Sequence, residues 1–124
     1  ITPFLLTLGE APKATYKDFL EDSEVVIINF PPKRIPNIIK IYQAQIQSIL
    51  PYISATQKVI FISSTSVYQN TNDEVTESMT IKPEKESGKA VAAVEQRLQQ
   101  ELGDRLTIIR FSGLIGEDRL PGRF

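Results

Sequence analysis

The sequence predicts an α/β fold in which the strands of a parallel sheet alternate with helices. Three segments, 25–30, 59–62 and 106–111, are almost continuously apolar, as is typical of parallel strands covered on both faces. Segments with apolar residues at helical spacing lie between them, so each strand leads through a right-handed crossover to the next. A chain of 124 residues is long enough for one domain with a hydrophobic core.

The first elements are predicted from short runs. The apolar run 4–8 ends at Gly9 and predicts a strand. Residues 13–21 carry apolar and aromatic side chains at helical spacing and predict a short amphipathic helix. The β-branched run 24–30 predicts the next strand. It must stop at Pro31-Pro32, because proline has no N–H for a sheet and these two prolines bar a helix from starting there.

The later elements are longer. Asn37 is placed to cap a helix that runs to about Ile53 and whose apolar residues fit a helical period. Residues 58–62 predict a strand, and the polar stretch 71–85 predicts a long loop. The best helix spans 87–102 and ends at Gly103, and a last strand is expected over 105–111. The apolar stripe of the helix over 87–102 is formed by Ala90, Val91, Val94, Leu98 and Leu102. Three aromatic residues at helical spacing are expected in the core, namely Phe19, Tyr42 and Tyr52.

Composition excludes several functional classes. The 14 basic and 15 acidic residues nearly balance and form no basic cluster, which disfavours nucleic acid as a partner. The chain has neither Cys nor His, so thiolate nucleophiles, disulfides and the commonest metal ligands are absent, and we expect no metal site. We also expect a cytoplasmic protein without membrane contact, because we find neither a signal-peptide pattern nor an apolar run of about 18 residues.

The most informative segment is an apolar strand that runs into a hydroxyl-rich turn, Phe61-Ile-Ser-Ser-Thr-Ser-Val-Tyr68. Here the chain resembles the extended short-chain dehydrogenase/reductase family, also called the NAD-dependent epimerase/dehydratase family. Three further segments resemble the family in the same order. They are Asn29-Phe30-Pro31-Pro32 after an earlier strand, Glu77 in a loop, and Arg110-Phe-Ser-Gly-Leu-Ile-Gly116 after the last strand.

The resemblance implies a Rossmann-like parallel sheet equivalent to the family's third to sixth strands. It also implies NAD or NADP as cofactor and a small sugar-like or carbonyl substrate. Ser64 would be catalytic, with its hydroxyl bonded to the substrate oxygen. Contacts to the cofactor are implied for Phe30, Pro31, Ser63, Ser112 and Gly113. An alternative without a ligand is that Ser63, Ser64 and Thr65 satisfy backbone groups where the strand ends.

The chain departs from the family at its acid–base pair. In the family a Tyr-x-x-x-Lys pair lies on one helical face, since residues four apart stack. Anchoring on Glu95 puts Ser87 at the Tyr position and Val91 at the Lys position. Lys89 lies two residues along, turned about 200° away, and is expected on the surface. The standard hydride chemistry is therefore not expected, and the chain looks closest to atypical members whose activities are mostly unassigned.

A second departure concerns the cofactor. No Gly-x-x-Gly-x-x-Gly occurs among the six glycines, although in this fold that turn brings backbone N–H groups to the pyrophosphate. We therefore expect residues 1–124 to form a partial domain. It would lack the family's N-terminal glycine-rich unit and its C-terminal substrate region, as an internal piece of a longer protein would.

Two functional hypotheses follow. The first is part of an NAD(P)-binding, atypical dehydrogenase- or epimerase-like protein, whose dinucleotide and substrate sites are complete only in the full-length parent. The second is a non-catalytic α/β module that senses a nucleotide or acts through protein association. A receiver-like domain is disfavoured, because the strand ends read Asn-Phe-Pro-Pro and Ser-Ser-Thr and offer no acidic pocket.

The last expectation concerns the faces of the sheet. Right-handed crossovers in one direction place all three helices on one face. Both faces are nevertheless apolar, and we expect Val25, Ile27 and Val59 on one of them and Val26, Ile28 and Ile60 on the other. The helix-free face would then be covered by a further part of the protein or by a second copy in a homodimer.

Overall fold

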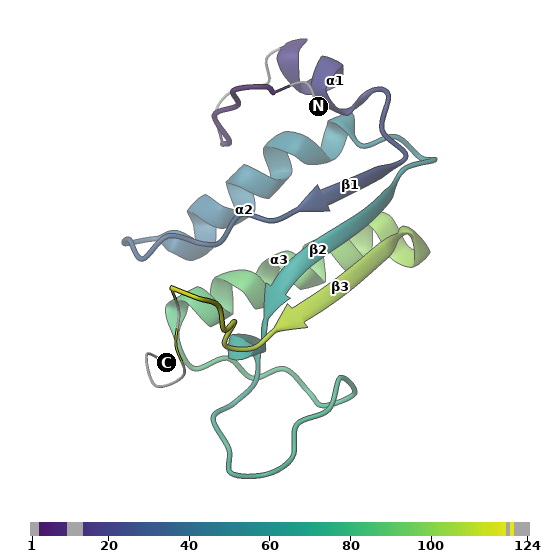
Figure 1. Ribbon diagram of the computed structural model, residues 1–124. Helices are drawn as coiled ribbons and strands as arrows, with labels where there is room; N and C mark the ends of the chain where they lie inside the picture. Colours follow the sequence, from purple (N-terminus) through teal and green to yellow (C-terminus); the bar gives the residue numbers. More distant parts are fainter. Residues whose placement is uncertain (1–2, 10–13, 119, 121–124) are drawn as a thin grey trace.

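A three-stranded parallel sheet with helices on one side forms the centre of the fold (Figure 1). The computed structural model describes residues 3–9, 14–118 and 120. The strands lie in the spatial order β1 (Val25–Ile28), β2 (Lys58–Ser64) and β3 (Leu106–Phe111). The helices are α1 (Ala14–Leu20), α2 (Ile38–Ile49) and α3 (Glu86–Leu102), with short 3₁₀ helices η1 (Leu50–Tyr52), η2 (Thr65–Val67) and η3 (Gly103–Arg105). The α/β fold with a parallel sheet is therefore confirmed.

The second helix differs from its prediction at both ends. Asn37 precedes α2 as expected, but its side chain makes no capping hydrogen bond. It adopts a left-handed backbone with φ 59°, a conformation that asparagine tolerates, and so turns the chain into the helix. At the other end α2 stops at Ile49, because Pro51 has no N–H to continue the helix and the chain tightens into η1.

The strand expected over 4–8 does not form, and that prediction is wrong. A strand needs a ladder of hydrogen bonds to a neighbour, but this segment is held by side chains instead. The Tyr16 hydroxyl donates to the Thr7 carbonyl at 2.5 Å, and the Gly9 N–H donates to Ser48 Oγ at 3.2 Å. The segment therefore contacts α1 and α2 rather than extending the sheet.

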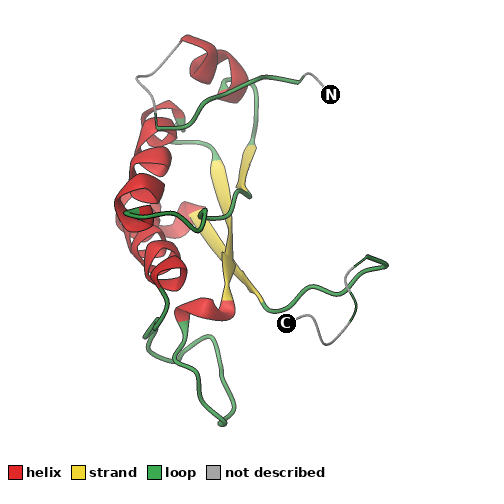
Figure 2. Cartoon of the chain, turned by 90° about the vertical axis from the view of Figure 1, so that its left-hand side faces the viewer, coloured by secondary structure: helices red, strands yellow, loops and turns green. Residues whose placement is uncertain are grey.

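The helical layer covers one face of the sheet, and Figure 2 shows no described helix on the other face. Helices α2 and α3 form this layer, whereas α1 packs near η1, with the rings of Tyr16 and Tyr52 5.7 Å apart. The register pairs Val26 with Val59 and Ile27 with Ile60. This corrects the expected grouping, because Val59 shares its face with Val26, under the helices, and Ile60 shares the bare face with Ile27.

The core lies between the sheet and the helical layer. Phe61 and Val59 of β2 are fully buried there, against Ile46 of α2 and Leu98 of α3. Tyr42 is buried as expected and donates its hydroxyl to the Phe30 carbonyl at 2.8 Å, and burial raises its pKa. Tyr52 is half-buried. Phe19 is 45% exposed, so its expected place in the core is wrong. Its ring meets Phe4 edge-on at 5.6 Å, because α1 turns only Tyr16 and Leu20 inward.

Within the described ranges, none of the helices has the length and apolar character needed to cross a membrane.

Candidate functional site

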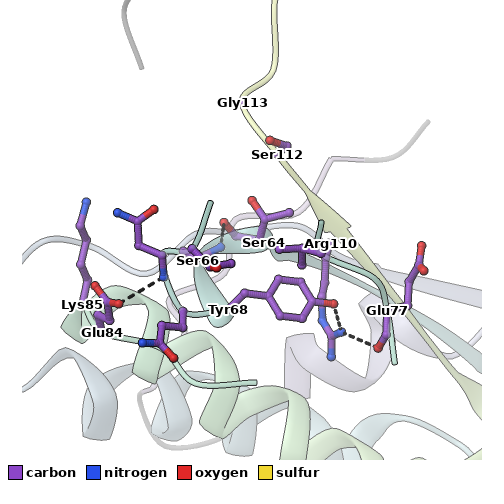
Figure 3. A pocket seen from close by; sticks show the side chains of 14 residues that line it. Ser64, Ser66, Tyr68, Glu77, Glu84, Lys85, Arg110, Ser112 and Gly113 are labelled. Carbon is purple, nitrogen blue, oxygen red and sulfur yellow. Dashed lines mark hydrogen bonds between the residues drawn. The ribbon is translucent and has the colours of Figure 1, made fainter. Parts of the chain in front are cut away.

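A hollow of about 810 Å³ opens where β2 and β3 end (Figure 3). The carboxyl ends of parallel strands meet at one edge of a sheet, which is where ligands bind in open α/β folds. The register pairs Ser64 with Phe111, so η2 and the residues after β3 lie side by side at this edge. The hollow is lined by hydroxyl and amide side chains from η2 and the following loop, by two acidic and two basic side chains, and by Ser112 and Gly113.

Ser64 is half-buried at the end of β2 and lines the hollow. Its Oγ accepts a hydrogen bond from the Ser66 N–H at 3.1 Å and so caps η2. This is the local role that the ligand-free alternative predicts for it. The hydroxyl proton remains available to a second partner, because this contact uses Ser64 only as an acceptor. The two readings of Ser64 are therefore compatible.

Ser63 occupies the opposite face of the strand from Ser64, because successive residues of a strand alternate. It is buried beneath the sheet, and its hydroxyl donates to Glu95 Oε1 at 2.5 Å. It does not line the hollow. The Ser63 side chain therefore lies at the interface between β2 and α3, and not in the hollow where a cofactor contact was expected.

Arg110 and Glu95 form a buried ion pair that joins β3 to α3. Arg110 Nε lies 3.0 Å from Glu95 Oε1 and Nη2 lies 2.8 Å from Oε2, a two-pronged contact that fits the guanidinium. The Glu95 side chain is 4% exposed and that of Arg110 is 20% exposed. The hydrogen bond to Glu95 is the main reason that the pKa of Arg110 lies above its ordinary value. Arg110 is thus a fixed positive charge at the rim of the hollow.

Tyr68 and the loop after it complete this network. Arg110 Nη1 donates to the Tyr68 hydroxyl at 2.5 Å and to the Glu77 carbonyl at 3.4 Å (Figure 3). The guanidinium also lies 5.1 Å from the centre of the Tyr68 ring. Glu77 itself is exposed and lines the hollow. The contact between Arg110 and Tyr68 was not predicted from the sequence. The sequence singles out the two segments that contain these residues, but it does not pair them.

Two α3 residues near the missing acid–base pair, Val91 and Lys89, lie where the sequence predicts them. Val91 is 5% exposed and belongs to the core. Lys89 is exposed, and its Nζ lies 2.8 Å from Glu86 Oε1 at the surface.

The absence of a side chain at Gly88 allows α3 to pack closely against η2. A Cβ on Gly88 would lie 2.4 Å from the Ser66 carbonyl oxygen, so only glycine fits here without a shift.

The remaining residues assigned to the cofactor divide into two groups. Ser112 and Gly113 line the hollow from the β3 side. Phe30 and Pro31 follow β1 and do not line it. Phe30 packs edge-on against Tyr42 at 5.5 Å, and Pro31 is exposed. Ser64, Ser112 and Gly113 therefore come together, whereas Phe30, Pro31 and Ser63 lie outside the hollow.

A dinucleotide fits this site in part. The hydroxyl-lined edge at Ser64 and Ser112 offers donors and acceptors of the kind that a ribose or a carboxamide needs. The sequence has no glycine-rich turn with the spacing that places backbone N–H groups at a pyrophosphate. The described residues also hold no cluster of His, Cys, Asp and Glu side chains fit for a metal ion.

Comparison with known proteins finds similarity to two curated proteins. No family model matches the chain, and no solved structure matches it significantly. The chain is similar to Protein YeeZ of Escherichia coli (strain K12) and to Protein YeeZ of Escherichia coli O157:H7. Each is 32% identical over 109 residues, which cover 86% of this chain and 40% of the relative. The chain thus spans less than half the length of these curated relatives.

Proposed function

We propose that this chain is part of an NAD(P)-binding protein of the extended short-chain dehydrogenase/reductase type, acting on an unassigned small molecule without the usual Tyr/Lys pair. The observation that carries the proposal is the hydroxyl-lined hollow at the carboxyl ends of β2 and β3, with Ser64 at its edge. Enzymes with open parallel sheets bind their ligands at this edge. The lining favours a polar ligand that accepts and donates several hydrogen bonds.

The cofactor would be held at this edge by Ser112 and Gly113, beside Ser64. When bound, a nicotinamide supplies hydride transfer to or from a carbon of the substrate. Ser64 would orient the substrate oxygen through its hydroxyl proton, since its oxygen already accepts from Ser66. Neither Val91 nor Lys89 would take part, because one is buried in the core and the other pairs with Glu86 at the surface.

The first test is binding of NADH and NADPH, measured by calorimetry. We expect the 124-residue chain by itself to bind either nucleotide weakly or not at all, because it has no glycine-rich turn for the pyrophosphate. Micromolar affinity of this chain alone would show that the dinucleotide is held in another way. The DNA upstream of Ile1 provides a second check, since a glycine-rich strand-turn-helix encoded there would support the assignment.

In a full-length parent that turns over a substrate, Ser64→Ala should lower turnover about a hundredfold, the lower range for an oriented donor to a developing charge. Lys89→Ala is the matched control, because within the described residues the Lys89 side chain bonds Glu86 at the surface and no other partner. It should leave turnover unchanged. A large loss in Lys89→Ala with native folding would mean that the register assigned to the Ser87-Gly-Lys segment is wrong.

The second candidate is a non-catalytic module that acts through association or nucleotide sensing. It is favoured by the bare sheet face, where Ile27 is 62% and Val25 is 44% exposed. The two candidates differ in one result. A full-length protein that binds NAD(P) but retains all its function in Ser64→Ala would be a sensor rather than an enzyme.

A further inference from the structure

Tyr68 is a titratable side chain of the hydroxyl-rich turn for which the proposed function has no role. It is half-buried after η2 and lines the hollow together with Ser64 and Arg110 (Figure 3). Its hydroxyl contacts Arg110 Nη1 at 2.5 Å. This contact connects a group of the hollow with the ion pair between β3 and α3.

The direction of this hydrogen bond is fixed by chemistry. A guanidinium carries donors only, so Arg110 donates and the Tyr68 oxygen accepts. The phenol keeps one proton of its own, for which we find no acceptor in the part of the chain that the structure describes. That proton is directed away from Arg110, and an oxygen atom of a ligand can accept it.

Arg110 is held in place before any ligand arrives. Two of its nitrogens contact Glu95, which is itself buried and accepts from the Ser63 hydroxyl. A donor fixed in this way loses little freedom on binding and stabilises negative charge that develops on its partner oxygen. Arg110 is therefore positioned to stabilise charge on the Tyr68 oxygen.

We propose that Tyr68 is the proton donor to the oxygen of a small polyhydroxylated carbonyl compound bound in this hollow, a role left vacant by Ser87 and Val91. The proposal rests on the proposed function. As negative charge develops on the ligand oxygen, the O–H bond of Tyr68 breaks and its proton passes to that oxygen. The electron pair stays on the phenolic oxygen beside Arg110.

The choice of ligand follows from the other groups in the hollow. Its lining offers hydroxyls and amides from Thr65, Ser66, Gln69, Asn70 and Thr71. The two carboxylates in the lining, Glu77 and Glu84, are matched by two cations, Lys85 and Arg110, so the lining carries no net charge. These side chains suit a neutral compound with several hydroxyl groups better than an apolar one. Dihydroxyacetone, which joins a carbonyl to two hydroxyl groups, is the probe that we choose.

The experiment labels tyrosine at the ring carbon that bears the hydroxyl and uses the full-length protein that contains this chain. The Tyr68 resonance is the one that Tyr68→Phe removes. We expect dihydroxyacetone to move this resonance until the site is saturated. In amide-shift titrations, Tyr68→Phe should weaken dihydroxyacetone binding by about fivefold to tenfold, as for the loss of one hydrogen bond. Tyr52→Phe is the matched control, because Tyr52 lies in η1, before β2 begins, and should leave binding unchanged.

Two results would overturn the proposal: a Tyr68 resonance that dihydroxyacetone does not move, or equal affinity of Tyr68→Phe and the parent for this probe. NADH and NADPH titrations are run separately on the same samples. Binding of dihydroxyacetone at Tyr68 without binding of either nucleotide would leave this subsite standing and reject the proposed function. Binding of either nucleotide with no effect of Tyr68→Phe on the probe would reject this subsite and leave the proposed function standing.

Discussion

Glu95 lies in the apolar stripe of α3, yet both oxygens of its carboxylate accept hydrogen bonds. Arg110 approaches both of its oxygens, and Ser63 donates to one of them. Three elements, β2, α3 and β3, therefore meet at one carboxylate. Removing it would leave the Arg110 guanidinium, 20% exposed, without its main partner.

We predict that Glu95→Ala lowers the free energy of unfolding by about 3 kcal/mol, the lower end for breaking a buried ion pair, because Arg110 retains some access to water. Urea unfolding followed by circular dichroism measures the change. Glu101→Ala is the control on the same helix, since Glu101 pairs with Arg97 at 3.1 Å on the surface, and it should cost less than about 1 kcal/mol. Equal losses in the two variants would contradict the role given to Glu95.

Some residue positions follow from the sequence and others do not. Helical spacing correctly placed Val91 in the core and Lys89 on the surface. The same spacing puts Glu95 in the apolar stripe with Val91 and Leu98, and strand alternation puts Arg110 on the covered face. Two charges at buried positions are a signal for a pair, and this signal was available. The contact of Arg110 with Tyr68 has no such signal in the sequence, because it depends on how η2 and β3 pack.

At the scale of elements, α3 and η2 approach each other closely. Gly88 lies in the first turns of α3, with its Cα facing the carbonyl of Ser66. Val67 of η2 is fully buried nearby, and Lys82 of the following loop donates its N–H to the Val67 carbonyl at 2.8 Å. The position of the hydroxyl-rich turn therefore depends on how near α3 can come.

We predict that Gly88→Ala destabilises the protein by about 1–3 kcal/mol, as overpacking does, although alanine favours a helix more than glycine does. The reason is the 2.4 Å separation between an added Cβ and a backbone oxygen, which cannot rotate away. Thermal unfolding measures the change. Lys89→Ala, exposed on the same helix, should remain within about 0.5 kcal/mol of the parent. A more stable Gly88→Ala variant would show that η2 moves at little cost.

The elements themselves were largely predictable because their patterns are local. The period of 3.6 gave α2 and α3, and continuous apolar runs gave the three strands. The run 4–8 has the same local pattern but no strand neighbour, and pairing is a property that only the tertiary structure decides. The polar loop 71–85 was likewise foreseen, but its attachment through Arg110 to the Glu77 carbonyl was not.

At the scale of the molecule, the sheet has two unlike sides (Figure 2). Helices α2 and α3 cover Val26, Ile28, Val59 and Phe61. The opposite face carries six apolar side chains with no described helix over them. They are Val25, Ile27, Ile60, Ile62, Ile109 and Phe111. Parallel sheets are almost always covered on both faces, so this surface needs a partner.

We predict that the 124-residue chain by itself associates through this face. Its molar mass by light scattering should rise with concentration, because leaving a large apolar side chain in water costs about 1.5–3 kcal/mol. The double variant Ile27→Lys and Ile109→Lys should abolish association and remain folded, since both side chains are exposed, 62% and 37% respectively. Lys17→Glu and Lys40→Glu, on exposed residues of α1 and α2 away from this face, serve as charge controls.

A substitution on this face distinguishes cover by a further part of the protein from cover by a second copy. If a further part of a longer protein covers the sheet, that longer protein should not associate through this face, and Ile27→Lys should destabilise it rather than dissociate it. If a second copy covers the sheet, Ile27→Lys should convert dimers to folded monomers, because the same patch meets itself across a two-fold axis. A wild-type chain of 124 residues that stays monomeric with this face in water would contradict both, and with them the view that this sheet is one part of a doubly covered fold.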